Sequence, residues 1–188
     1  MLSREFQELT IDWIAVSDAV RAYEEDANGR FYAETYGPIL DLFGLSDIST
    51  QQKVVACWSW MSGNYKPTHL QRLDGLFVLR PESLHELTSA NCALNIDMYV
   101  EAERVLGTVG ASKFLHFAFP NSFVMWDDKI RCYSLTLATA SRNQESLYKQ
   151  FCLCLADKIR VAPRPADLAS SVTTPRLLDM WLWTIAGL

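Results

Sequence analysis

The sequence lacks most of the patterns that mark membrane, secreted, metal-dependent or nucleotide-dependent proteins. No apolar run reaches the roughly 18 residues of a transmembrane helix, and the opening MLSREFQELT has no apolar signal core. The five cysteines form no C-x-x-C pair, and the three histidines form no H-E-x-x-H pattern. Neither G-x-G-x-x-G nor a phosphate-binding P-loop is present. We therefore expect a cytoplasmic protein with reduced thiols and with no membrane association, metal or cofactor.

The composition is that of an ordinary globular domain, with an unusual share of aromatic residues. The chain has 188 residues, of which 49% are hydrophobic and 21% are charged, and it includes 6 Trp, 7 Tyr and 9 Phe. This length predicts a single domain, with two small lobes around a cleft as the upper limit. The net charge of −5 is concentrated in residues 1–50, which hold 10 acidic and 3 basic side chains. A basic face on the remainder is therefore allowed.

The hydrophobic pattern predicts helices almost throughout. Apolar residues recur at the helical spacing of three to four, and breaks are expected at Asn28-Gly29, at Gly63-Asn64 and at Gly107. A separate short segment is expected over Pro38–Phe43, and the run 76–79 is compatible with a strand or a buried helical turn. We therefore predict an all-α fold. The longer helices are expected to begin after Thr50, at Pro81, at Ser89, after Ser112, after Asp127, near residue 144 and at Pro175.

The most informative segment is Val109 to Arg131, VGASKFLHFAFPNSFVMWDDKIR. Lys113 follows a glycine turn at a predicted helix start, and fourteen residues later Asp127 follows a short apolar run at the start of the next helix. A helix, a turn and an extended return can bring these two residues together. Each also has an ordinary explanation, since Lys113 could be a solvated lysine beside a turn and Asp127 a simple helix N-cap.

This segment resembles the 8-oxoguanine DNA glycosylase-like (OGG-fold) members of the helix-hairpin-helix DNA glycosylase superfamily. The family pattern S-K-x-L-H-F-x-x-P-x-x-F-x-x-W-D is matched from Ser112 to Asp127, and the family's closing helix P-R-L-L-D-x-x-x-W is matched from Pro175 to Trp183. The resemblance covers the motif-bearing part, about residues 81–188. The hairpin differs from the family's L-P-G-V-G-x-K, because Thr108 stands where its first glycine would be.

The resemblance implies a two-lobed helical fold and a base-excising enzyme that acts on double-stranded DNA with a flipped base. The implied catalytic residues are Asp127 and Lys113. The residues implied or suggested for binding the base or the DNA are His116, Trp126, Ser112, Gly110, Lys129 and Arg131. Two tryptophan pairs, Trp58 with Trp60 and Trp181 with Trp183, are each two residues apart, so one ring of each pair could line a cleft.

The chemistry explains why these residue types would be used. Breaking an N-glycosidic bond builds positive charge on the sugar, and a carboxylate such as Asp127 stabilises that charge. A lysine amine such as Lys113 can attack the sugar C1′ and form a Schiff base, which opens a strand-cleaving lyase route. Such an enzyme extrudes its target base and holds it by stacking. His116 shares a helical face with Lys113, although a hydrogen-bonded core histidine is the commoner case.

Several readings stay open at this stage. The enzyme is expected to excise an oxidised purine in DNA repair or a hypermodified base of invading phage DNA in antiviral defence, with or without lyase activity. In bacteria it would be cytoplasmic and associated with the nucleoid. The alternative is a non-catalytic helical module that binds DNA or protein on the same scaffold. A third reading is a helical structural protein with no role on nucleic acid, which predicts no salt-dependent DNA binding.

Overall fold

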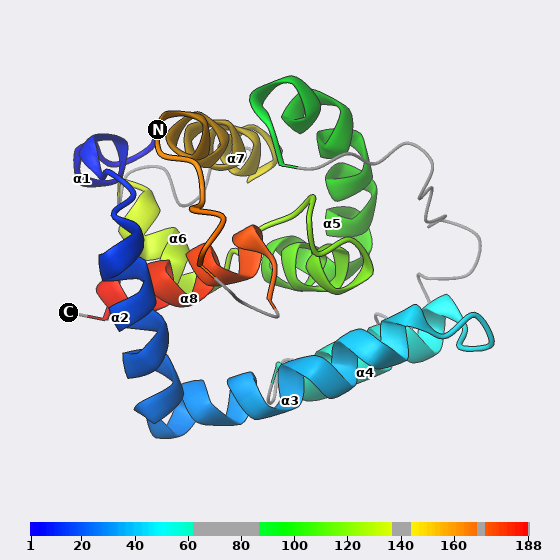
Figure 1. Ribbon diagram of the computed structural model, residues 1–188. Helices are drawn as coiled ribbons and strands as arrows, with labels where there is room; N and C mark the ends of the chain where they lie inside the picture. The colour runs from blue at the N-terminus through cyan, green and yellow to red at the C-terminus, as the bar shows by residue number, and fades with distance from the viewer. Residues whose placement is uncertain (62–86, 137–143, 169–171, 188) are drawn as a thin grey trace.

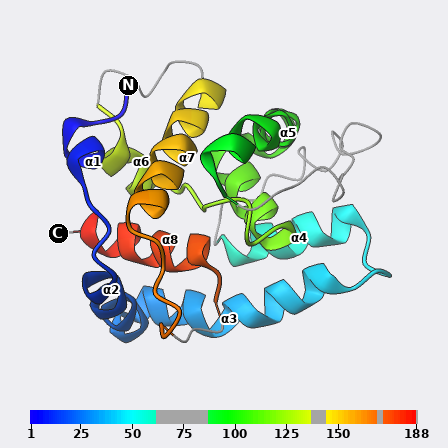
Figure 2. The same cartoon turned by 45° about the horizontal axis from the view of Figure 1, so that its top comes forward.

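The structure is a computed structural model that describes residues 1–61, 87–136, 144–168 and 172–187. These residues form eight α-helices and contain no β-strand beyond an isolated bridge between Leu2 and Leu135, so the all-α prediction is confirmed. Figures 1 and 2 show the arrangement of the helices. The helices are α1 (Arg4–Glu8), α2 (Trp13–Glu25), α3 (Ala27–Gly44), α4 (Thr50–Trp60), α5 (Ser89–Ala118), α6 (Asp128–Ser134), α7 (Gln144–Val161) and α8 (Thr174–Ile185).

Helix α8 occupies the middle of the molecule. It lies along α2 and also contacts α6, while α3 and α4 run side by side below it and α5 packs against α7 above it (Figures 1 and 2). All residues from Pro175 to Leu182 are buried, so α8 is covered on every side over two turns. A helix buried all round must be apolar all round, and α8 is so except at Arg176 and Asp179. Those two residues therefore need partners inside the core.

Helix starts follow the sequence closely, with two corrections. Asp127 caps α6 by accepting a hydrogen bond from the Ile130 amide (3.0 Å), as predicted, and Pro175 lies in the first turn of α8. The N-cap of helix α4 is Ser49 and not the predicted Thr50, because Ser49 and Gln52 form a reciprocal capping box. The expected break at Asn28-Gly29 is also wrong. The break lies at Asp26, whose carboxylate accepts from the amides of both residues.

The predicted separate segment over Pro38–Phe43 is wrong as well. Pro38 lies inside α3, which continues through it to Gly44. Proline at this place removes one intrahelical hydrogen bond, and helices tolerate that loss when tertiary packing compensates. Here Tyr36 and Phe43 of the same helix are buried in the core. The short helix α1 has no counterpart among the predicted elements, and the predictions that fall on residues 62–86 lie outside the described residues.

Helix α5 is interrupted once, at Gly107, so the predicted break at this residue is confirmed, whereas the predicted hairpin after it is not. Gly107 has φ 71° and ψ 169°, a backbone conformation that side chains with a Cβ rarely adopt, and helical geometry resumes directly after it. Gly110 is therefore not a turn residue. It lies in the second half of α5 and faces the Trp58 ring, where a Cβ would lie 3.6 Å from Nε1. Ser112 accordingly lies inside the helix and does not cap it, and Lys113 is not at a helix N-terminus.

The N-terminal residues form backbone hydrogen bonds with the end of α6 and the residues that follow it. The Ser3 amide donates to the Ser134 carbonyl (2.9 Å), and the Thr136 amide donates to the Met1 carbonyl (3.3 Å). The described part of the chain includes no helix with the length and apolar character that crossing a bilayer requires.

Candidate functional site

A small cavity lies where α2, α3, α4, α5 and α8 meet the start of α6. Four titratable groups border it, namely Lys113, Asp127, Arg176 and Asp179. Aromatic rings form most of the remaining wall, namely Tyr23, Tyr32, Trp60 and Trp183. Its volume of about 20 Å³ is enough for one water molecule. The two residues predicted to be catalytic are thus brought together, although they come from different helices.

One hydrogen bond explains how Lys113 and Asp127 come to the same place. Ser112 Oγ accepts a hydrogen bond of 3.0 Å from the backbone amide of Trp126, and both residues are fully buried. Ser112 and Trp126 are the residues immediately before Lys113 and Asp127. The bond therefore joins the two backbones one position before each candidate residue. The second half of α5 and the extended segment that returns from it are held side by side at this point.

Lys113 points its ammonium toward aromatic faces. Its Nζ lies 5.2 Å from the centre of the Trp60 ring and 5.6 Å from the centre of the Tyr32 ring. Indole and phenol faces attract cations, and such contacts are stronger where water is excluded. Trp60 is itself fixed, because its Nε1 donates to the Thr35 hydroxyl (2.8 Å). The lysine is therefore held in a defined position beside the cavity.

Asp127 is held by the cap of α6. One of its carboxylate oxygens, Oδ1, accepts the amide hydrogen of Ile130. The prediction that Asp127 is the N-cap of α6 is therefore confirmed. The N-cap role does not compete with a role in the cavity, because Asp127 also borders that space. A capped carboxylate is fixed in orientation, which is what electrostatic stabilisation of a cationic intermediate requires.

Arg176 and Asp179 form a buried ion pair on α8. Their guanidinium and carboxylate are in direct contact, and Arg176 also donates to the Tyr23 hydroxyl (3.4 Å). The guanidinium carbon lies 4.7 Å from the centre of the Tyr36 ring and 6.0 Å from that of Trp60. Burial raises the pKa of Asp179 to about 6, although Arg176 opposes this, and Asp127 raises it further. Asp179 is thus a carboxyl group that binds a proton more readily than an exposed aspartate does.

His116 lies in the core and not at the cavity. It is fully buried, and its Nδ1 lies 2.7 Å from the Phe123 carbonyl, which can only accept a hydrogen bond. Nδ1 therefore carries the hydrogen, and Nε2 accepts from the Tyr36 hydroxyl at 2.8 Å. Burial lowers the pKa of His116 to about 3, so the ring is neutral at neutral pH. Both ring nitrogens are occupied by the protein itself, which leaves none to bind a base or a phosphate.

Three further predicted binding residues are also enclosed by the protein. Ser112 and Trp126 are fully buried, and Gly110 is buried against α4. The Trp126 ring stacks on Phe151 at 5.5 Å, and its Nε1 donates to Ser134 (3.1 Å). These positions hold the second half of α5, the returning segment and α6 together. They position the candidate catalytic residues and do not form a surface.

Lys129 and Arg131 both lie on α6. Lys129 Nζ is 3.5 Å from the centre of the Trp183 ring, so it covers one of the aromatic walls. Arg131 donates to Asp128 (2.7 Å), and its side chain is 20% exposed. The Arg131 guanidinium lies 5.4 Å from the centre of the buried Trp126 ring, so of these two residues it is Lys129 that contacts the cavity wall.

The sequence reasoning missed Tyr23, Tyr32, Arg176 and Asp179. A signal existed for two of them, because Arg176 and Asp179 are the only charges within the apolar run PRLLDMWLW and are three residues apart. Such a pair on a helix that is otherwise apolar predicts a buried ion pair. The tryptophan pairs behave as expected, since Trp60 and Trp183 line the cavity while Trp58 and Trp181 are buried in the core.

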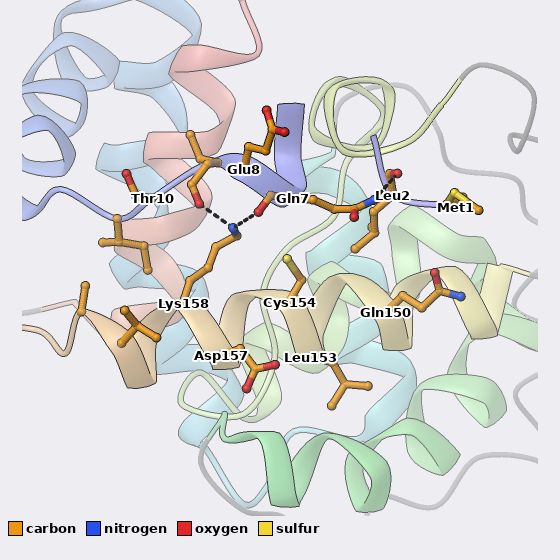
Figure 3. A pocket seen from close by; sticks show the side chains of 14 residues that line it. Met1, Leu2, Gln7, Glu8, Thr10, Gln150, Leu153, Cys154, Asp157 and Lys158 are labelled. Carbon is orange, nitrogen blue, oxygen red and sulfur yellow. Dashed lines mark hydrogen bonds between the residues drawn. The ribbon is translucent and has the colours of Figure 1, made fainter. Parts of the chain in front are cut away.

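A much larger groove lies elsewhere, between α1 and α7. It has a volume of about 790 Å³ and a mainly apolar lining that includes Leu9, Leu153 and Val161 (Figure 3). Lys158 crosses it, and its ammonium donates to the backbone carbonyls of Gln7 (2.9 Å) and Leu9. Burial raises the pKa of the Cys154 thiol, which therefore is not an activated nucleophile. This groove is larger than the cavity at Lys113, but fewer titratable side chains converge in it.

No three His, Cys, Asp or Glu side chains gather as a metal site would require anywhere in residues 1–61, 87–136, 144–168 and 172–187. Comparisons with protein-family models, with curated proteins and with solved structures found no match.

Proposed function

We propose that this chain is a DNA glycosylase that excises a damaged or modified base, with Asp127 and Lys113 as its catalytic residues. The observation that carries the proposal is the convergence of these two side chains on one cavity walled by aromatic rings. The resemblance in sequence supports it, because the residues that converge are the same two that the family pattern assigns to catalysis. A two-lobed helix-hairpin-helix architecture belongs to the same proposal.

Asp127 would stabilise the positive charge that develops on the sugar as the N-glycosidic bond breaks. Its carboxylate is already oriented by the Ile130 amide, so little reorganisation is needed during the reaction. Lys113 would attack C1′ as a free amine and form a Schiff base with the sugar. The alternative use of Lys113 is electrostatic, with Asp127 activating a water molecule that replaces the base.

The aromatic rings would receive the extruded base. Base stacking on such rings is the common way in which glycosylases hold a flipped nucleotide. The cavity of about 20 Å³ admits one water molecule, so a base enters only when its wall opens. Lys129 is the side chain best placed to open it, because it lies over the Trp183 ring and can turn toward a phosphate of the DNA.

The small cavity is also the observation that favours a second candidate. A helical module that binds DNA or protein without chemistry needs no space for a base. In that case Lys113 and Asp127 would serve the packing of α5 and α6. The two candidates make opposite predictions about base release, and they share the prediction of binding.

The experiment is a base-excision assay on labelled duplexes that contain 8-oxoguanine, uracil, alkylated purines, hydroxymethylcytosine or glucosylated hydroxymethylcytosine. Abasic sites are measured for the wild type, Asp127→Asn and Lys113→Gln. Asp128→Asn is the matched control, because Asp128 is the next residue and its side chain is 79% exposed. We expect release of one base, a loss of about 100-fold or more in Asp127→Asn, and full activity in the control.

Other outcomes decide between the candidates. Salt-sensitive binding with no base release on any duplex would favour the binding module. The absence of both binding and release would contradict any role on DNA. Equal losses in Asp127→Asn and Asp128→Asn would contradict the assignment of Asp127.

A further inference from the structure

We infer that Asp179 accepts the ammonium proton of Lys113 and so produces the free amine that attacks C1′. Asp179 would be a positioning residue in this role, since it acts on the substrate only through Lys113. The inference rests on the proposed glycosylase function and adds to it, because the family pattern that was matched assigns catalysis to Lys113 and Asp127 alone.

The geometry brings Asp179 and Lys113 to one water-sized space. Lys113 enters from α5 and Asp179 from α8, and both border the same cavity of about 20 Å³. Trp60 is shared, since its ring faces the Lys113 ammonium on one helix and the Arg176 guanidinium on the other. Asp179 is 5% exposed, so bulk water does not compete for its proton.

The ion pair with Arg176 fixes where the Asp179 carboxylate points. Arg176 is held by the Tyr23 hydroxyl and by the Tyr36 ring, and it contacts Asp179 directly. The carboxylate therefore cannot rotate freely on α8. A proton acceptor must be placed in this way before the reaction, because proton transfer depends on alignment.

Asp179 suits this step better than Asp127 for two reasons. Asp127 has to stay charged while the sugar becomes cationic, and its Oδ1 is already engaged by the Ile130 amide. Burial raises the pKa of Asp179 to about 6, which brings it closer to the pKa of an amine. A base whose pKa is close to the working pH is the more efficient acceptor.

The groups that face Asp179 come from every helix around it. They are Arg176 on α8, Lys113 on α5, Asp127 at the start of α6, Tyr23 on α2 and Tyr36 on α3. Burial raises the pKa of Tyr23 and of Tyr36 to about 12, so both stay neutral near pH 7. Arg176 and Lys113 favour the carboxylate form, whereas Asp127 favours the protonated form.

The step is balanced. An N–H bond of the Lys113 ammonium breaks, an O–H bond forms on Asp179, and the electron pair stays on Nζ. That pair then attacks C1′, and the glycosidic bond breaks with its electrons leaving on the base, which is protonated from solvent. On an abasic site the amine adds to the C1′ aldehyde, and the resulting hydroxyl takes up a proton and leaves as water. The iminium ion that remains is reduced by a borohydride reagent to a stable adduct.

The test measures this adduct on an abasic-site duplex from pH 5 to pH 9, with sodium cyanoborohydride as the reductant. The proteins are the wild type, Asp179→Asn, Arg176→Gln and the baseline variant Lys113→Gln, with rates expressed per folded protein from circular dichroism. We expect Asp179→Asn to lose about 100-fold at pH 7 and to recover toward the wild-type rate by pH 9. Arg176→Gln keeps the carboxylate, so it should retain more of the wild-type rate at pH 7 than Asp179→Asn does, although loss of the guanidinium raises the Asp179 pKa and moves the rise of its profile to somewhat higher pH.

A doubly substituted protein covers the case in which Asp179→Asn does not fold. Arg176→Met with Asp179→Leu removes both charges and keeps an apolar, filled core, which buried ion pairs usually tolerate. We expect the same shift to higher pH in this protein, measured against Arg176→Gln. A double variant with the wild-type profile would overturn the inference.

The remaining outcomes separate the inference from the proposed function. Equal losses in Asp179→Asn and Arg176→Gln, with an unchanged pH profile, would show that the pair only holds α8 in place and would overturn the inference. A wild type that releases bases but forms no adduct would overturn it too, while the glycosylase function would stand. A wild type that does neither would contradict both.

Discussion

The cavity at Lys113 and the groove between α1 and α7 differ in almost every respect. The cavity is about 20 Å³ and is bordered by four charged side chains, whereas the groove is about 790 Å³ and mainly apolar. The groove has by far the greater volume of the two. The titratable side chains converge at the cavity, where burial and the neighbouring charges shift the pKa of Asp179. A convergent set of titratable groups is the better guide to function here.

Two ion pairs, one beside the cavity and one beside the groove, show the difference between the two regions. Arg176 and Asp179 on α8 and Asp157 and Arg160 on α7 are both ion pairs three residues apart. The side chains of Arg176 and Asp179 are 2% and 7% exposed, whereas those of Asp157 and Arg160 are 60% and 71% exposed. The same two residue types at the same spacing therefore form a buried ion pair on α8 and a solvent-exposed ion pair on α7. The buried pair also contacts the Tyr23 hydroxyl and the Tyr36 ring in the core.

The largest expected difference comes from breaking each pair in turn. Arg176→Met leaves the Asp179 carboxylate and the Tyr23 hydroxyl without their partner inside the core, and we expect a loss of about 3–5 kcal/mol in the free energy of unfolding. Arg160→Met removes an exposed partner, and we expect a loss of less than about 0.5 kcal/mol. Urea denaturation followed by circular dichroism measures both values.

The double variant Arg176→Met with Asp179→Leu is the control for this prediction. We expect it to recover most of the stability lost in Arg176→Met, because no uncompensated charge remains. A loss of stability in Arg160→Met as large as that in Arg176→Met would remove the distinction between the two regions.

The second difference is a dependence on pH. His116 has a pKa of about 3 in the folded protein against 6.5 in an unfolded chain, so its contribution is complete above pH 6.5 and is lost as the pH falls toward 3. We expect the stability advantage of the wild type over His116→Gln to shrink by about 3 kcal/mol between pH 7.5 and pH 4.5. Unfolding by urea at the two pH values measures it.

Asp179 acts in the opposite direction and partly offsets this loss in the wild type. Its folded pKa of about 6 lies above the ordinary 3.8, so its contribution is largest at low pH and is lost as the pH rises through 6. Because Asp179 is present in both the wild type and His116→Gln, its contribution cancels when the stabilities of these two proteins are compared at each pH. A groove variant such as Lys158→Met should follow the wild-type pH dependence. An unchanged gap between wild type and His116→Gln would mean that His116 is charged in the fold.

The smallest effect is expected in the groove. Lys158→Met loses the hydrogen bonds to the Gln7 and Leu9 carbonyls at the end of α1, which should cost about 1 kcal/mol of stability. We expect no change in base release, since α1 does not border the cavity. A loss of base release similar to that of Lys113→Gln would assign the groove to the same site, and the two regions would then be one.

The helices were predictable where local chemistry decides them. Asp127 caps α6 and Pro175 lies in the first turn of α8, because caps and first-turn prolines act over three or four residues. Glycine was a poorer guide. Gly107 and Gly110 look alike in the sequence, but only Gly107 has a positive φ, while Gly110 has helical geometry and a Cβ there would lie 3.2 Å from Leu106 Cβ. No local pattern distinguishes the two glycines.

The candidate site was predictable only in its central pair. The interval from Lys113 to Asp127 matches a family pattern, and so it could be recognised. Tyr23 and Tyr32 lie about ninety residues away in the chain and join the site through packing, which no local pattern records. Ser112 and Trp126 were expected to touch DNA, and their hydrogen bond shows instead how one buried contact can fix two neighbouring residues.

The central place of α8 has a consequence for how this chain reaches its fold. The helix that α2, α3 and α6 pack around is encoded by residues 174–185, far along the chain from α2, so the interior depends on pairings of very large sequence separation. High contact order slows folding. On the ribosome, where synthesis proceeds from the N-terminus, the apolar faces of the earlier helices stay uncovered until α8 emerges. The folding of the core is therefore set by residues that are synthesised late.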